Sequence, residues 1–387
     1  MKTLISECIN DAIEFNRPYV AKNSFMYMQL AVENAHTCGD GPFTKRCQGF
    51  LERKIGVARA LMTTSCTDAL EMAAVLLNIQ PGDEVILPSF TFVSTANAFV
   101  LRGATPVFCD IKPDTLNLDV ERLEALIGSR TKAIVPVHYA GVACEMDEIM
   151  GIADSYGVPV VEDNAHGLFG KYKGKNLGTI GAMAAQSFHE TKNFNCGEGG
   201  ALLINENKYT ERAEIIREKG TNRNRFFRGL VDKYTWVDIG SSHLPSDLLS
   251  AYLYAQFEVS DEIQAFRESI WKLYDHSLRR WAENVGVTQP NVPSYCDQAF
   301  HMYYLLMPSL ATRQGLIQHL KQLNITSPFH YLPLHLSSMG IKFGSSLGDC
   351  PVTESISDRI IRLPFHNSII ASELDRVIDG IKSFKLS

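Results

Sequence analysis

Short apolar runs alternate with segments of helical periodicity through the first half of the chain. Four apolar runs predict buried strands, at residues 85–87, 106–108, 133–137 and 158–161. Between them, three segments space their apolar residues three or four positions apart and predict helices, at residues 68–79, 120–127 and 147–156. This alternation predicts an α/β fold with a mostly parallel sheet, in which ligands bind at the carboxyl ends of the strands.

The pattern changes after residue 200. The elements expected there are a strand (201–204), a helix (209–219), an arginine-rich loop (220–228), a helical stretch (246–285), a strand (302–307) and two helices (309–323 and 372–384). We therefore expect a large α/β domain over residues 26–250 and a smaller α+β domain over residues 251–387, with residues 1–25 packing near the smaller one.

Charge and cysteine content disfavour several classes of protein and of binding site. A net charge of −6 over 387 residues disfavours a nucleic-acid surface. The nine cysteines contain no C-x-x-C pair, which favours free thiols in a reducing compartment over disulfides or a metal site. We see no targeting segment and no apolar stretch of membrane-spanning length. A cytoplasmic enzyme without a metal ion or a membrane partner is expected.

The candidate chemistry centres on a lysine and an acid. Asp163 ends the apolar run 158–161, and Lys192 follows it within the segment Ser-Phe-His-Glu-Thr-Lys-Asn, before a glycine-rich turn at residues 197–200. Pyridoxal 5′-phosphate (PLP) needs an amine to hold it as an imine and a carboxylate to keep its ring nitrogen protonated. Taken singly, Asp163 is equally well a helix cap, and Lys192 an ordinary surface lysine.

Other parts of a PLP site come in a workable chain order. The segment 64–69 opens a predicted helix, whose first N–H groups could bind the cofactor phosphate, with the Ser187 hydroxyl beside them. Phe92 could stack on the cofactor ring, and His166 could reach its hydroxyl group. Considered alone, the segment is more simply a helix cap, Phe92 a core residue and His166 a structural or exposed histidine. The combination favours the cofactor.

Six further motifs carry a family resemblance over nearly the whole chain after about residue 16. They are CGDG (38–41), FTFVSTANAF (90–99), PVHYAGV (136–142), FHETKN (188–193), KGTNR (219–223) and FHYLPLH (329–335). With them the chain resembles the DegT/StrS family of sugar-nucleotide aminotransferases, of the aspartate aminotransferase fold (fold type I). Within that family it is most similar to the dTDP-4-amino-4,6-dideoxygalactose transaminases.

The resemblance implies a role for each candidate residue. Lys192 would hold PLP and act as the catalytic base, Asp163 would pair with the ring nitrogen, and Phe92 would stack on the ring. Backbone N–H groups of Cys66 and Thr67, with the Ser187 hydroxyl, would bind the phosphate. The implied substrate-binding residues are Lys219, Asn222, Arg223, Arg228 and His330.

Two positions depart from the family pattern. His166 stands where the family usually has glutamine, and a histidine can still donate a hydrogen bond to the ring hydroxyl. Ser242 stands where relatives place an asparagine that reaches the phosphate of the neighbouring subunit, so the resemblance does not carry that asparagine contact over to this chain. Some relatives carry histidine in place of the lysine and catalyse dehydration; Lys192 therefore favours transamination.

The expected reaction moves an amino group from glutamate to C4 of a dTDP-4-keto-6-deoxyhexose, in a pathway to O-antigen or another surface polysaccharide. The galacto product is the first expectation and its gluco epimer the alternative; a C3 aminotransferase is less favoured. The enzyme is expected to be a homodimer. Rival functions are a sugar dehydratase, a cysteine desulfurase, or a non-catalytic sensor of PLP or sugar nucleotide. Intact Lys192 and Asp163 argue against the dehydratase and the sensor, and no cysteine is marked as a nucleophile.

Overall fold

The computed structural model describes residues 12–385 of the chain. Its centre is a sheet in two hydrogen-bonded parts, ordered β1-β9-β8-β5 and β3-β2-β4, which isolated parallel bridges join at Ile134–Val160 and Val137–Asp163. The strands are β1 (Arg59–Thr63), β2 (Glu84–Pro88), β3 (Thr105–Cys109), β4 (Thr131–Ile134), β5 (Val161–Asp163), β8 (Met183–Ser187) and β9 (Gly200–Ile204). The predicted strands at 85–87, 106–108 and 201–204 are confirmed, and the run 133–137 ends as a strand at Ile134.

The sheet is mostly parallel, as predicted. Only β9 runs against its two neighbours, β1 and β8, because residues 188–199 fold back and return the chain alongside β8 in the opposite direction. The pairs β5–β8, β2–β3 and β2–β4 are parallel. β1 and β8 were not predicted from the sequence.

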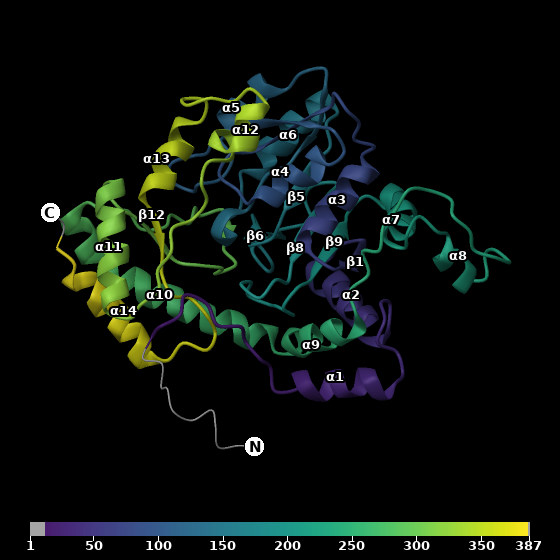
Figure 1. Ribbon diagram of the computed structural model, residues 1–387, viewed down its shortest axis with the longest axis horizontal. Helices are drawn as coiled ribbons and strands as arrows, with labels where there is room; N and C mark the ends of the chain where they lie inside the picture. Colours follow the sequence, from purple (N-terminus) through teal and green to yellow (C-terminus); the bar gives the residue numbers. More distant parts are fainter. Residues whose placement is uncertain (1–11, 386–387) are drawn as a thin grey trace.

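Helices cover the sheet, as Figure 1 shows. They are α1 (Ser24–Glu33), α2 (Pro42–Ile55), α3 (Cys66–Leu76), α4 (Val93–Val100), α5 (Val120–Leu126), α6 (Met146–Tyr156), α7 (Thr210–Arg217) and α9 (Asp247–Glu258), with 3-10 turns η1 (Tyr139–Gly141) and η2 (Asn207–Tyr209). Apolar side chains of α3 and α4 form one core against the sheet, and those of α2 and α9 form another. The three helices predicted between the strands are confirmed, and α5 is capped by Asp119 as expected.

A second unit is built on the long helix α10 (Ser260–Val285). Its other elements are β11 (Tyr304–Leu306), α11 (Leu310–Gln322), η3 (Leu334–Leu336), α12 (Ser338–Lys342), α13 (Pro351–Arg359), β12 (Ile360–Arg362) and α14 (Ala371–Ser383). β11 pairs with β12, and a separate small sheet contains β10 (Cys296–Asp297), β6 (Lys171–Tyr172) and β7 (Lys175–Asn176). Ile13 forms a parallel bridge with Ile325 and lies in the core of this unit.

The stretch 246–285 forms two helices rather than one, because the helical conformation is interrupted at Val259, between α9 and α10. α9 packs on α1 and α2, whereas the buried face of α10 contributes to the core that contains Ile13. The division into residues 26–250 and 251–387 stays a proposal, and its boundary falls within α9. Residues 1–11 of the expected N-terminal segment lie outside the described part of the chain.

The arginine-rich segment projects from the body. It contains the short helix α8 (Arg223–Phe227), where a loop was predicted, and in Figure 1 α8 stands clear of the other helices on the right of the view. We call residues 219–240 the arm. Its tip exposes large apolar side chains: Phe227, Leu230 and Trp236 are 68%, 62% and 76% exposed.

Candidate active site

The candidate site lies where several strands end at one edge of the sheet. Asp163 is the last residue of β5 and Ser187 the last of β8. Lys192 is in the connection from β8 to β9. Two backbone hydrogen bonds hold this connection together: the Glu190 N–H donates to the Gly197 carbonyl, and the Cys196 N–H donates to the Phe188 carbonyl. Helix α3 begins at Cys66, soon after β1 ends at Thr63. The sheet therefore brings together groups that are far apart in the sequence.

Asp163 is buried and held in a fixed orientation. Thr95 Oγ1 donates to one carboxylate oxygen at 2.7 Å, and the Ala165 N–H donates to the other at 3.1 Å. Burial raises the pKa of Asp163, although both donors and the charge of Lys192 oppose that rise. A protonated ring nitrogen is the kind of partner that keeps such a carboxyl ionised.

Lys192 has a reactive amine. Burial, helped by the positive charge of Arg362 and opposed by Cys66 and Asp163, lowers its pKa from 10.5 to about 8. A small cavity beside the lysine is lined by His166, Ser187, His301 and their neighbours. Near pH 8 a large fraction of the Lys192 amines is therefore uncharged and able to act as a nucleophile.

The start of α3 forms a cradle of backbone donors. Ser65 caps the helix by accepting from the Asp68 N–H at 3.0 Å, and the first N–H groups, those of Cys66 and Thr67, have no intrahelical acceptor. Gly200 of β9 passes directly beneath, because a Cβ there would lie 2.4 Å from Cys66 N. Gly200 also pairs with Ser187 in the sheet, so Ser187, at the end of β8, lies beside the start of α3. This arrangement suits a phosphate.

Three buried histidines line the other side. The rings of His166 and His301 stack at 4.1 Å, and His330 lies 6.2 Å from His166. Burial lowers the pKa of all three, so they are neutral near pH 7. His166 Nδ1 accepts from the Ala140 N–H at 3.3 Å. The proton of His166 is therefore on Nε2, which is free to donate.

Sequence reasoning missed three side chains in this region. Thr95 supports Asp163 from α4; its signal was the hydroxyl-rich segment after Phe92, within one of the family motifs. His301 Nδ1 lies 2.9 Å from the Asn193 amide oxygen, next to Lys192. Arg362 comes from β12, and its charge acts on Lys192, His166 and His330. Neither His301 nor Arg362 carries a local sequence signal.

Two predicted cofactor residues, Phe92 and Ser242, are exposed to solvent. Phe92 precedes α4 and is 56% exposed, so its interpretation as a core residue is wrong; its ring centroid is 6.4 Å from that of Tyr331. Ser242 is also exposed and forms a bridge with Glu218 of its own chain. Its neighbour His243 is buried, with Nδ1 3.1 Å from Asp68 in the first turn of α3. Both exposed side chains are open to a second molecule.

The predicted substrate-binding residues divide in two. His330 lies in the cluster, where its Nδ1 is 2.7 Å from the Tyr139 hydroxyl. Lys219, Asn222, Arg223 and Arg228 are on or beside the arm. There Lys219 and Arg223 contact Glu218, Arg228 contacts Glu214, and Asn222 accepts from the Thr235 N–H. The partners of these four residues belong to the arm, to α7 and to Glu218, and not to the residues that surround Lys192.

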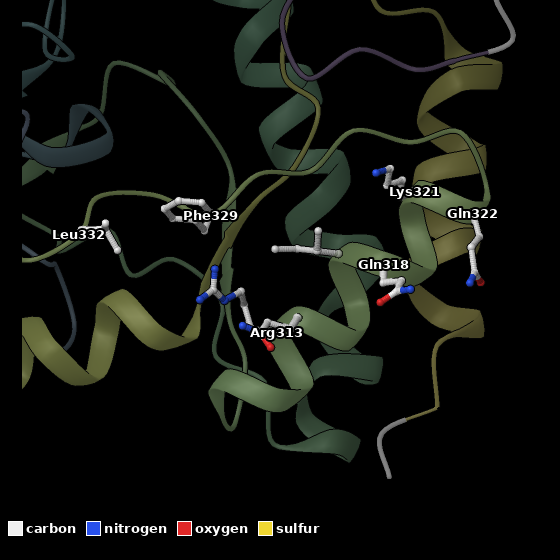
Figure 2. A pocket seen from close by; sticks show the side chains of 8 residues that line it. Arg313, Gln318, Lys321, Gln322, Phe329 and Leu332 are labelled. Atoms are coloured by element: carbon white, nitrogen blue, oxygen red, sulfur yellow. The ribbon is translucent and has the colours of Figure 1, made fainter.

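A surface groove of about 910 Å³ lies elsewhere, along α11 (Figure 2). Arg313, Gln318 and Lys321 of α11 line one side, with Phe329 and Leu332 on the neighbouring segment. It contains none of the predicted site residues, so its size does not mark the chemistry. Within residues 12–385, no helix is long and apolar enough to cross a membrane, and no cluster of side chains is suited to hold a metal ion.

Known proteins match this chain in sequence and structure. The model of the DegT/DnrJ/EryC1/StrS aminotransferase family matches residues 20–382. The spore coat polysaccharide biosynthesis protein SpsC of Bacillus subtilis is 32% identical, with 96% of this chain and 97% of SpsC covered. GDP-perosamine synthase of Caulobacter vibrioides is 34% identical, with 84% and 85% covered.

Solved structures agree. The aminotransferase TlmJ from Streptoalloteichus hindustanus has a TM-score of 0.88 at 28% identity, covering 96% of this chain and 98% of TlmJ. The PLP form of Spr1654 from Streptococcus pneumoniae has a TM-score of 0.88 at 25% identity, covering 96% and 98%. Three features of the site suit PLP. Gly200 leaves no room for a Cβ beside the backbone donors at the start of α3, Asp163 is buried, and the pKa of Lys192 is low. The chain belongs to the DegT/DnrJ/EryC1/StrS aminotransferase family and is a PLP-dependent enzyme of fold type I.

Proposed function

We propose that this enzyme transfers an amino group from glutamate to C4 of a dTDP-4-keto-6-deoxyhexose and forms dTDP-4-amino-4,6-dideoxygalactose. The observation that carries the transamination is the low-pKa amine of Lys192, enclosed between a buried carboxyl, Asp163, and the start of α3. The sugar and its nucleotide rest on the motif resemblance, and on relatives whose names concern polysaccharide and sugar-nucleotide synthesis.

The residues that hold PLP follow from their hydrogen-bonding capacity. Backbone N–H groups of Cys66 and Thr67, with the Ser187 hydroxyl, would bind the phosphate. Asp163, fixed by Thr95 and Ala165, would accept from the ring nitrogen. His166 would donate from Nε2 to the ring hydroxyl, because its Nδ1 is already an acceptor. Bound PLP supplies an electron sink for the carbon that gains or loses the amine.

Lys192 has two tasks in this proposal. It holds the cofactor through its amine, and once the substrate has displaced it, it moves a proton to and from the reacting carbon. A pKa of about 8 suits both tasks, because the amine can accept a proton and return it near neutral pH. The enclosing residues, His301 and Phe194 among them, limit access of water to Lys192.

The enzyme would act as a homodimer with each arm at the partner's site. Exposed Trp236, Phe227 and Leu230 on a projecting segment are unusual for the surface of a monomer. The arm also carries Arg223 and Arg228, whose guanidinium groups suit the diphosphate of a sugar nucleotide. Phe92 would stack on the PLP ring, and in a dimer the exposed Ser242 hydroxyl would meet the second subunit or its ligands.

The test is to incubate the purified enzyme with PLP, glutamate and either the 4-keto or the 3-keto dTDP sugar, and to determine the product by NMR. We expect an axial amine at C4. An equatorial C4 amine would select the gluco epimer, and an amine at C3 or no amine would refute the substrate. A GDP-linked 4-keto sugar belongs in the same series because of the 34% identical GDP-perosamine synthase. A sensor would leave the visible absorption of bound PLP unchanged when glutamate is added.

A further inference from the structure

His301 is held beside the reacting lysine by a strained turn and a buried arginine. Phe300, the residue before it, has a φ of 49°, a backbone conformation that is unfavourable for a residue with a side chain. Arg267 of α10 donates from Nε to the Phe300 carbonyl at 2.9 Å and from Nη2 to the His301 carbonyl at 2.6 Å. The fold therefore maintains a costly turn that fixes His301, as is typical of a residue with a function.

The hydrogen bonds around Asn193 determine which ring nitrogen of His301 carries the proton. The Asn193 amide nitrogen donates to the Ala299 carbonyl at 2.8 Å and to Gln264 Oε1 at 3.2 Å. Its amide oxygen, which can only accept, lies 2.9 Å from His301 Nδ1, so Nδ1 is the donor. Burial lowers the pKa of His301, and the neutral ring carries a single proton. Nε2 is therefore an acceptor.

His301 and Lys192 line the same small cavity. Its volume is about 10 Å³, hardly more than one water molecule needs, so groups on its walls reach one another directly or through a single water. Within residues 12–385, no protein group forms a hydrogen bond with His301 Nε2. The charge of Lys192 also contributes to the lowered pKa of His301, as expected for close neighbours.

We propose that His301 Nε2 accepts a hydrogen bond from the Lys192 amine whenever that amine is not joined to the cofactor. Such a bond keeps the released amine close to the place where it takes up and returns a proton. His301 is then a positioning residue, because it acts on the reaction through Lys192. The inference rests on the proposed function, in which Lys192 holds PLP. The alternative is that His301 only supports the His166 ring, on which it stacks at 4.1 Å.

The two readings differ in what they predict for the titration of Lys192. The ionisable groups that act on Lys192 or His301 come from several elements: Cys66, Asp163, His166, Arg267, His330 and Arg362. They all remain in a variant at position 301. An acceptor stabilises the ammonium form, so its loss should lower the pKa of Lys192. Damage that merely opens the site to water would raise that pKa toward its ordinary value.

The test is the rate at which the full-length apoprotein attaches PLP, followed by stopped-flow absorbance as a function of pH. In His301→Asn, the shorter amide can keep the contact with Asn193, but nothing replaces Nε2. In His301→Gln, the longer side chain can place an amide oxygen near the position of Nε2. His319→Asn is the matched control, because His319 of α11 contacts the Gly380 carbonyl of α14.

We expect the midpoint of the pH profile to fall by about one pH unit in His301→Asn and to stay near the wild-type value in His301→Gln and His319→Asn. Near pH 7, His301→Asn should therefore attach PLP about fivefold faster than wild type. An unchanged or raised midpoint in His301→Asn would overturn the assignment. So would equal shifts in both His301 variants, which the stacking alternative predicts.

A second measurement reads the wild-type enzyme directly. ¹⁵N NMR of histidine-labelled enzyme, with the His301 signals identified by their absence in His301→Gln, should show the proton on Nδ1. A proton on Nε2 would contradict the proposal, and this measurement decides if thermal unfolding shows that His301→Asn is not folded. Neither experiment uses a sugar, so failure to aminate the proposed keto sugar would refute the proposed function and leave this result standing. PLP attachment by Lys192→Ala would refute both.

Discussion

Burial gives Lys192 an amine that titrates near neutral pH, and this has a measurable consequence at the scale of one residue. Because its pKa is about 8 and only the neutral amine attacks, the rate at which apoprotein attaches PLP should rise about tenfold per pH unit below pH 8 and level off above it. Stopped-flow absorbance measures this rate. Free Nα-acetyl-lysine is the control and should show no plateau near pH 8.

Lys192→Ala should attach no PLP and have no transaminase activity; steady turnover by that variant would refute the assignment.

Asp163 should be essential for turnover but not for folding. Asp163→Ala removes the partner of the ring nitrogen, and we expect kcat to fall about 100-fold or more with little change in the melting temperature. Thr95→Val removes only one donor to Asp163 and should cost about tenfold. If Asp163→Ala retains PLP normally and turns over within a few-fold of wild type, Asp163 is simply a helix cap.

Position 166 should accept glutamine. The histidine accepts from the Ala140 N–H and leaves one donor free, and a glutamine amide can likewise accept through its oxygen and donate through its nitrogen. His166→Gln should therefore retain activity. His166→Ala loses the donor, which costs about 0.5–1.5 kcal/mol. Initial rates and PLP dissociation constants of the three forms measure this difference. Equal values for all three would mean that His166 does not touch the cofactor.

At this scale, the sequence was informative where a functional group follows directly from a strand or a motif. Asp163 ends an apolar run and Lys192 precedes a glycine turn, so both were predictable. Thr95, His301 and Arg362 reach the site only through packing of distant segments. A buried threonine, histidine or arginine has no periodicity that distinguishes it from an ordinary one, and this is why they were not predicted.

At the scale of elements, strands rich in β-branched residues were predicted and strands of small residues were not. β2 reads Glu-Val-Ile-Leu-Pro, whereas β8 reads Met-Ala-Ala-Gln-Ser and has little β propensity of its own. β8 is a strand because it is buried between β5 and β9. The break between α9 and α10 was also missed, since no glycine or proline marks Val259 and both helices continue the apolar periodicity.

The crossing of β9 beneath α3 should tolerate only glycine. A Cβ at Gly200 would lie 2.3 Å from the Ser65 carbonyl carbon and 2.4 Å from Cys66 N, so α3 must move away from its position. Gly200→Ala should therefore destabilise the fold by about 1–3 kcal/mol and weaken PLP binding. Calorimetric melting and a PLP titration measure the two effects. Gly151→Ala in α6 is the control, because nothing lies within 4 Å of a Cβ there. Normal PLP affinity in Gly200→Ala would show that the cradle is not the phosphate site.

At the scale of the whole molecule, association should depend on the arm. Replacing Phe227 and Trp236 by serine removes two large exposed side chains from its tip without disturbing a core. We expect sedimentation velocity to show a dimer for wild type and monomer for the double variant, with activity lost alongside. Leu347→Ser is the control, since Leu347 is 77% exposed but lies far along the chain, after α12. A fully active wild-type monomer would exclude shared active sites.

The bridge between Ile13 and Ile325 has a consequence for biosynthesis. Ile13 N donates to the Asn324 carbonyl, the Phe365 N–H donates to the Phe15 carbonyl, and the Asn16 side chain donates to the Glu190 carbonyl beside the catalytic lysine. A ribosome releases residues 13–16 long before it makes residues 324–365. Residues 13–16 must therefore wait for residues 324–365 to be synthesised, and the core of the α10 unit closes only after that. A nascent chain stalled before residue 324 would contain the strands of the main sheet but could not form the contacts of residues 13–15 with residues 324–365.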